Sequence, residues 1–124
     1  MLATGVDILH IERMEHALAA HGERFLNRVF TPQEILTCAG NPSRLAARFA
    51  AKEAAGKMLG VGMRILHKDG IGWREAEVTG DDNGQPILLL HGSAAARARA
   101  LGLAQWALSL AHERDTAIAF VVAM

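Results

Sequence analysis

The order of elements along the chain predicts an α+β fold, in which a mainly antiparallel sheet packs with a long central helix and shorter helices. A first strand over residues 2–9 is followed by three helical segments, and the later strands come as two hairpins with a short helix between them. Helices gathered in one part of a chain and strands that return in hairpins are typical of α+β proteins. The 124 residues suffice for one core, so a single domain over 1–124 is expected.

A long helix over residues 44–60 has the clearest signals in the sequence. Asn41 is a good N-cap, and Pro42 stands at the first helical position, where its missing N–H costs nothing. Gly60 and Gly62 lie where such a helix ends. One side of this helix carries an apolar stripe that consists of Leu45, Phe49, Gly56 and Leu59. The opposite side is mostly alanine, which favours close packing over contact with water.

Three charged side chains belong to this small and apolar helix. Lys52 falls inside the apolar stripe, while Glu53 and Lys57 lie four residues apart at its boundary and are neighbours on the helix surface. The helix alone leaves two interpretations open. One is an ordinary ion pair with Lys52 extending its amine to water. The other is a partly buried carboxylate for a metal, with lysines for phosphate oxygens.

The remaining elements follow from helix starts, turns and apolar runs. Residues 63–71 are expected to be irregular, with a turn at 67–70, and residues 81–84 are a clear hairpin turn. The strand over 116–123 is so uniformly apolar that it is expected to be buried on both faces. The other expected elements are a helix over 11–20, a helix opened by the capping box at 31–34, a hairpin of 73–79 and 86–90, a helix over 93–101 and a strand over 104–111.

Composition narrows the class of protein. The formal net charge is zero, so nothing global favours nucleic acid, and an acidic partner would need a local basic patch. The single cysteine, Cys38, excludes an internal disulfide and suits a reducing compartment. The first residues lack a signal peptide, and no apolar run reaches the length of a membrane helix, which predicts a cytoplasmic protein.

A carboxylate near the end of the first strand, Asp7, is the remaining unusual feature. Aspartate is depleted in strands, and this one stands between Val6 and Ile8. Two roles fit it: an exposed charge at a sheet edge, or a ligand at the end of a mainly apolar strand.

Three segments together resemble the holo-acyl-carrier-protein synthases, the small single-domain type of 4′-phosphopantetheinyl transferase. They are the G-x-D motif of residues 5–7, the F-x-x-K-E-A-x-x-K motif of residues 49–57, and the strand end at 108–112. The resemblance runs from about Gly5 to Val122 and includes the turn at 83–86. The helix motif carries most of it, because G-x-D alone is too short to be specific.

This resemblance implies a reaction and its catalytic residues. Magnesium is held by Asp7 and Glu53, together with the pyrophosphate of coenzyme A and waters, which suits a hard cation that prefers oxygen. The serine hydroxyl of a carrier protein attacks the β-phosphate of coenzyme A, and 3′,5′-ADP leaves. Lys57 contacts the phosphates, Lys52 is a second candidate contact, and Glu53 is the usual suggestion for the general base.

The resemblance also implies binding surfaces. Arg13, Arg24 and Arg28 form a docking face for the acidic helix of acyl carrier protein in fatty acid or polyketide synthesis. Such proteins form homotrimers with coenzyme A between adjacent subunits. The nucleotide pocket is expected to include Phe49, which suits the core equally well, together with Gly60, Gly62 and His112, the last of which suits either a hydrogen bond to coenzyme A or a structural turn.

One departure from the family pattern leaves alternatives open. Many relatives carry a glutamate three residues after the N-terminal aspartate, and this chain has His10 there. A non-catalytic coenzyme A-binding or nucleotide-binding trimer is one rival, which Asp7, Glu53 and Lys57 argue against. A metal-dependent phosphohydrolase is another, which would not need the three arginines.

Overall fold

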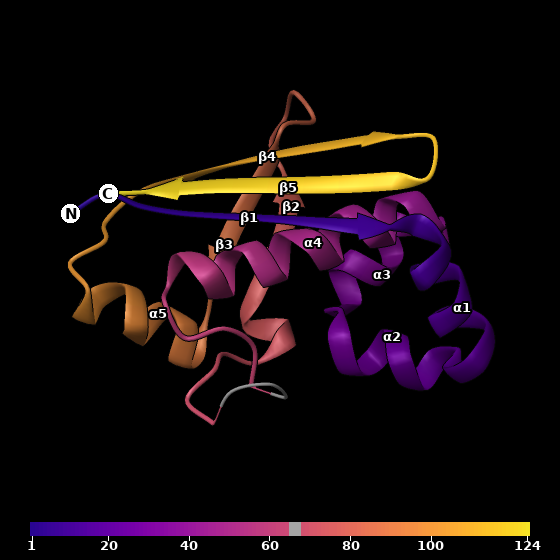
Figure 1. Cartoon of the computed structure of the whole chain (residues 1–124), viewed down its shortest axis with the longest axis horizontal. Helices are drawn as coiled ribbons and strands as arrows, with labels where there is room; N and C mark the ends of the chain where they lie inside the picture. Colours follow the sequence, from indigo (N-terminus) through magenta and orange to yellow (C-terminus); the bar gives the residue numbers. More distant parts are fainter. Residues whose placement is uncertain (65–67) are drawn as a thin grey trace.

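The computed structural model of the chain describes residues 1–64 and 68–124 and has the predicted α+β architecture (Figure 1). None of its described helices combines the length and the apolar character needed to cross a membrane. Its elements are β1 (Ala3–His10), α1 (Ile11–His21), α2 (Glu23–Val29), α3 (Pro32–Cys38), α4 (Pro42–Met58), a 3-10 turn (Trp73–Glu75), β2 (Ala76–Gly80), β3 (Pro86–Leu90), α5 (Gly92–Ala100), β4 (Trp106–Glu113) and β5 (Thr116–Ala123).

Most predicted boundaries are confirmed to within a few residues, and three differ. The basic stretch around Phe25, for which no element was predicted, is the helix α2. The expected strand over 73–79 begins as a 3-10 turn and becomes extended only at Ala76. The strand β4 continues to Glu113, so the loop before β5 is shorter than predicted. The predicted turn at 67–70 includes His67, which lies outside the described residues.

Both predicted helix starts are confirmed at the level of hydrogen bonds. The Asn41 side chain accepts from the backbone N–H of Arg44 at 3.1 Å and caps α4. At α3, Thr31 Oγ1 accepts from the N–H of Glu34, and Glu34 Oε1 accepts from the N–H of Thr31 at 2.9 Å. These bonds satisfy backbone donors that the first turn of a helix leaves without partners.

The main sheet is antiparallel in the order β1-β5-β4, and α4 packs against one of its faces (Figure 1). Side chains in β1 and β5 alternate between the two faces, as the pleat requires. Those facing α4 are buried, among them Leu9, Ala119 and Val121. The hairpin β2–β3 forms a separate two-stranded sheet, which approaches β4 through β3.

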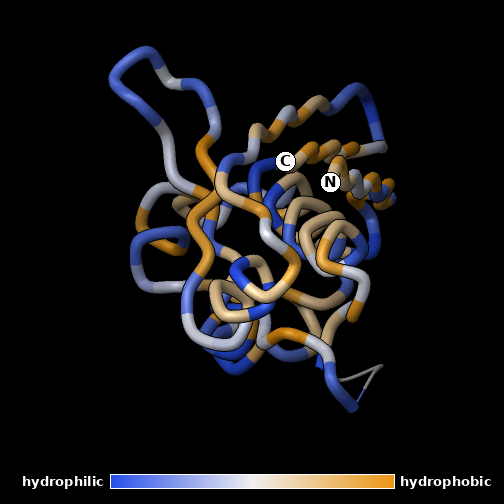
Figure 2. Tube along the Cα trace, turned by 90° about the vertical axis from the view of Figure 1, so that its left-hand side faces the viewer, coloured by the Kyte–Doolittle hydropathy of each residue, from blue (hydrophilic) through white to orange (hydrophobic). Residues whose placement is uncertain are grey.

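The prediction that the strand 116–123 is buried on both faces is wrong for the single chain. Ile118 and Phe120 are 40% and 44% exposed, because α4 covers only the other face. They pair across the sheet with Ile8 and Val6, which are 62% and 53% exposed. We call these four residues the outer sheet face. Figure 2 shows the hydrophobic colour of the strands beside the two labelled chain ends, where β1 begins and β5 ends.

A single glycine allows β1 to approach α4 closely. A Cβ placed on Gly5 would lie 1.9 Å from the carbonyl oxygen of Ala54, which belongs to the rigid backbone of α4. The first residue of the G-x-D motif is therefore required for packing, because it brings the strand that carries Asp7 against the helix that carries Glu53 and Lys57.

The variant Gly5→Ala is expected to lower the free energy of unfolding by about 3 kcal/mol, the upper part of the range for overpacked sites. The cause is displacement of β1 from α4, which urea denaturation at a fixed protein concentration would measure. Gly80→Ala is the matched control, because its added Cβ would meet the Gln85 carbonyl oxygen at an ordinary 3.7 Å. Equal losses in the two variants would contradict the assignment of this packing role to Gly5.

Candidate active site

The structure brings the G-x-D motif and the K-E-A-x-x-K part of the helix motif into contact. Lys57 Nζ donates to Asp7 Oδ1 at 3.1 Å and to the backbone oxygen of Val6 at 3.1 Å. The Lys57 side chain is 56% exposed and that of Asp7 only 13%, so the pair lies at the surface with its carboxylate partly buried. Residues fifty positions apart therefore meet where β1 passes over α4.

Glu53 lies one helical turn before Lys57 and adds a second carboxylate near Asp7. Its pKa is raised, first by burial and then by the negative charge of Asp7, while Lys57 and Arg13 act in the opposite direction. A partly buried carboxylate with a second carboxylate and cationic side chains beside it forms an arrangement that a divalent cation would stabilise.

The charge set fits magnesium only with further ligands. The described residues contain no group of three or more His, Cys, Asp or Glu side chains placed to hold a metal ion. Mg²⁺ is usually bound through one or two protein carboxylates plus waters and substrate phosphates. Asp7 and Glu53 fit that mode better than a site built entirely from protein ligands.

The three arginines are arranged around Phe25. Arg13 lines a groove of about 170 Å³ together with Leu9, Phe25 and Phe49. Arg24 and Arg28 line a neighbouring hollow of about 670 Å³ that also includes Phe25. The groove and the hollow thus share one aromatic ring, and Arg13 lies close enough to Glu53 to act on the pKa of that carboxylate.

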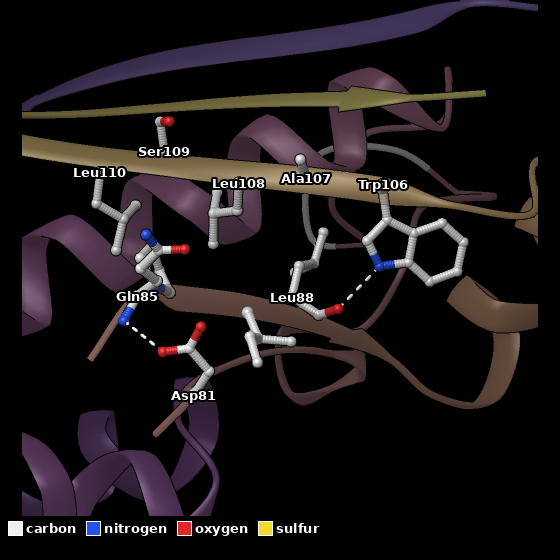
Figure 3. A pocket seen from close by; sticks show the side chains of 10 residues that line it. Asp81, Gln85, Leu88, Trp106, Ala107, Leu108, Ser109 and Leu110 are labelled. Carbon is white, nitrogen blue, oxygen red and sulfur yellow. Dashed lines mark hydrogen bonds between the residues drawn. The ribbon is translucent and has the colours of Figure 1, made fainter. Parts of the chain in front are cut away.

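A further hollow of about 450 Å³ lies between β3 and β4 (Figure 3). Trp106 Nε1 donates to the backbone oxygen of Leu88 at 2.8 Å and joins the two strands at one end of this hollow. Gln85 and Asp81, from the predicted turn, lie near the other end, and Asp81 Oδ1 accepts from the N–H of Gln85. The turn at 83–86 therefore lines a hollow that is separate from the groove at Arg13.

A family model described as "4'-phosphopantetheinyl transferase superfamily" matches residues 3–121. The chain belongs to this superfamily. A protein named holo-(acyl-carrier-protein) synthase from Herpetosiphon aurantiacus is 49% identical over 126 residues, which cover 100% of this chain and 99% of that protein. A protein of the same name from Halorhodospira halophila is also 49% identical, and the match covers 95% of this chain and 93% of that protein.

Solved structures agree with this superfamily assignment. The holo-(acyl-carrier-protein) synthase of Helicobacter pylori in complex with coenzyme A has a TM-score of 0.86 at 28% identity, over 98% of this chain and 99% of that one. The Neisseria meningitidis enzyme of the same name has a TM-score of 0.85 at 34% identity, over 98% and 97% of the two chains. The resemblance inferred from the sequence and the predicted fold class are both confirmed.

Lys52 lies in the transferase motif, and the sequence predicted that its amine would reach water or a phosphate. The structure shows that this prediction is wrong. Its side chain has no exposed surface, and its Nζ is 2.7 Å from Glu34 Oε1. It neither extends to water nor lies open to a phosphate, because its amine faces α3 and β2. The partner Glu34 was recognised only as a capping-box residue, and nothing in the spacing indicates that it also binds a lysine eighteen positions away.

The other residues that were predicted to line the nucleotide pocket do not all lie together. Phe49 stacks on Trp73 at 4.7 Å between ring centroids, so it contributes to the core as well as lining the groove at Arg13. Gly60 and Gly62 have positive φ values of 75° and 67° and end α4 just beyond Lys57. His112 is exposed near the end of β4 and lines a separate hollow, which shares no residue with the groove at Arg13.

Proposed function

We propose that this protein transfers the 4′-phosphopantetheine arm of coenzyme A to a serine hydroxyl of apo acyl carrier protein and releases 3′,5′-ADP. The observation that carries the proposal is the meeting of Asp7, Glu53 and Lys57 at the crossing of β1 and α4, in a chain of this superfamily. The names of its relatives and the coenzyme A bound to the Helicobacter pylori enzyme support the same reaction.

Asp7 and Glu53 would hold Mg²⁺, which, when bound, would offset the charge on the pyrophosphate and orient it. Lys57 would add a fixed positive charge to the phosphate oxygens. Glu53 would accept the serine proton, directly or through a water, as the serine Oγ forms its bond to the β-phosphorus. The bond between that phosphorus and the bridging oxygen breaks, and 3′,5′-ADP leaves with the electron pair.

The test is the intact mass of an apo acyl carrier protein after incubation with the purified protein, coenzyme A and Mg²⁺. The carrier is expected to become heavier by one phosphopantetheine arm, and the gain is expected to vanish when EDTA removes the metal. An unchanged mass with several apo carriers, while coenzyme A still binds, would leave a coenzyme A-binding protein without this activity.

The carrier protein would dock on Arg13, Arg24 and Arg28, which line the two hollows that share Phe25, with Arg13 nearest to Glu53. A basic face of this kind fits an acidic helix, so the interaction should weaken as salt increases. It would bring the serine of the carrier to the edge of the site that contains Glu53.

Charge reversal separates this docking role from a metal-dependent hydrolase. The double variant Arg24→Glu/Arg28→Glu is expected to raise the KM for the carrier at least about tenfold, which corresponds to about 1.4 kcal/mol. The KM for coenzyme A should stay unchanged, and so should any hydrolysis of coenzyme A. Arg99→Glu, at an exposed position of α5, is the control for a charge reversal outside this face. A carrier KM equal to that of the parent would exclude this surface.

The active form would be a homotrimer with coenzyme A bound between adjacent subunits. The outer sheet face supports this assembly, because four large apolar side chains side by side on one sheet face are typical of an interface. The protein would act in the cytoplasm as a single transferase domain in fatty acid or polyketide synthesis. The buried free thiol of Cys38 is compatible with a reducing compartment.

A charge on the outer sheet face is expected to break the trimer. Sedimentation velocity should give a trimer for the parent and a monomer for Phe120→Asp, because the aspartate would have to lose its water at the interface. Leu36→Asp is the matched control, since Leu36 is 74% exposed on α3 and does not belong to this face. A trimeric Phe120→Asp variant would show that the assembly uses another surface.

A further inference from the structure

A buried ion pair that the proposed reaction does not use lies directly beside the catalytic helix residues. Lys52 and Glu34 are both without exposed side-chain surface, and Lys52 immediately precedes Glu53 on α4. Successive residues of an α-helix point about 100° apart, so Lys52 faces the interior while Glu53 faces β1 and Asp7. The direction of one side chain therefore determines the direction of the other.

Each charged group of the pair is bound by groups from other elements. Lys52 Nζ donates to Glu34 Oε1 at 2.7 Å and to the backbone oxygen of Ala76 at 2.8 Å, at the start of β2. Glu34 Oε2 accepts from the N–H of Val78 at 2.9 Å, and its Oε1 also accepts from the N–H of Thr31. These directional bonds fix α4 against α3 and β2 at one point.

The network continues from this point to the surface. Thr31 Oγ1 donates to Glu77 Oε2, and Glu77 Oε1 lies 3.0 Å from His91 Nε2. His91 directly precedes α5, so α3, β2 and the start of α5 are all connected to Lys52 through hydrogen bonds. The position of the lysine is thereby determined from outside α4.

The close approach of Gly5 to Ala54 sets the distance between β1 and α4, but the rest of the buried surface of α4 offers few directional contacts. Most of its buried residues are alanines, whose small side chains interlock little with neighbouring elements. A shift by one residue would move the helix by only about 1.5 Å along its axis but rotate its faces by about 100°. Such a shift would take Glu53 and Lys57 away from Asp7. The buried alanines are Ala46, Ala47, Ala50, Ala51, Ala54 and Ala55.

We propose that Glu34 and Lys52 are positioning residues for the transfer reaction, which hold α4 at the rotation that places Glu53 and Lys57 against Asp7. The inference rests on the proposed function. A buried ion pair is a poor source of stability, because two apolar side chains of similar volume often serve as well. Its directional bonds instead specify one arrangement of the elements, which apolar contacts between alanines do not.

The test uses the double variant Glu34→Gln/Lys52→Met, in which both side chains keep their approximate length and lose their charge. Its kcat is expected to fall on the order of 10²-fold, the loss associated with a misplacement of about 1 Å. The Mg²⁺ concentration for half-maximal activity should rise as well. Leu103→Ala, a buried change elsewhere, is the control for lost stability, and both proteins are assayed where they are fully folded.

A second readout distinguishes positioning from a purely structural role. In the parent, Lys57→Met is expected to reduce kcat strongly, whereas in the double variant the same change should cost much less, because Lys57 no longer faces the site. An undiminished effect of Lys57→Met in the double variant would overturn the proposal. Should the double variant fail to fold, Glu34→Asp keeps the charge but shortens the reach, and the same comparison applies to it.

A crystal structure of the metal-free variant tests the inference without any activity. The parent contact between Lys57 Nζ and Asp7 Oδ1, 3.1 Å here, is expected to be lost in the variant. Its retention would overturn the positioning role. Loss of this contact in the variant, combined with a parent that transfers nothing, would instead mean that the proposed function is wrong and the positioning is right.

Discussion

Glu53→Gln is expected to lower kcat for transfer by about 10³-fold while the protein stays folded, a loss of the size seen when one preorganised electrostatic group is removed. Glutamine has nearly the same shape, so the packing of α4 is kept. It cannot carry the negative charge that would hold Mg²⁺ beside Asp7, and it cannot accept the serine proton. The measurement is the initial rate of carrier mass gain at saturating coenzyme A.

Stability provides an independent check on the same variant. Because the folded protein raises the pKa of Glu53, ionisation of this side chain opposes folding. Metal-free parent protein should therefore lose stability as pH increases from the ordinary glutamate pKa through the raised value. Glu53→Gln should remove this loss and be more stable than the parent near neutral pH in EDTA. Glu15→Gln, on exposed α1 surface, should change neither rate nor stability.

A variant with unchanged kcat would exclude Glu53 both as a metal ligand and as the base. A variant with low kcat that is also less stable in EDTA at neutral pH would point to a packing role. The two readouts therefore separate chemistry from structure at this residue.

Local signals predicted the parts of the fold that are determined locally. The cap at Asn41 and the capping box at Thr31 place the starts of α4 and α3, because each involves residues within three positions. Asp7 and Lys57 could be brought together from the sequence only through the resemblance to the family. Their contact depends on a strand and a helix separated by fifty residues, for which no spacing rule exists.

Two errors have causes outside the local pattern. The partner of Lys52 is Glu34 on another helix, and an apolar stripe with one lysine gives no information about which distant carboxylate meets it. The uniformly apolar β5 was expected to be buried on both faces. Within one chain α4 covers one face of β5 and leaves Ile118 and Phe120 on the other face partly exposed, because an apolar pattern does not tell which elements cover a strand.

Lys52→Met is expected to lower the free energy of unfolding by about 3–5 kcal/mol, which makes it the largest stability effect foreseen for a single substitution in this chain. Methionine fills the space of the lysine stem, so the loss does not come from a cavity. It comes from Glu34, whose carboxylate would stay buried with no positive charge beside it and with the oxygen of Ala76 also left without its donor.

The comparison with Glu34→Gln/Lys52→Met tests this explanation. If the cost arises from an unpaired buried charge, the double variant should be more stable than Lys52→Met alone, although it has one more substitution. Urea unfolding at one fixed protomer concentration measures both, because assembly makes apparent stability depend on concentration. A double variant less stable than Lys52→Met would mean that the individual hydrogen bonds, not the uncompensated charge, account for the loss. In that case the pair stabilises the fold through contacts that neutral side chains cannot replace. It would then contribute to the free energy of unfolding as well as fix the rotation of α4.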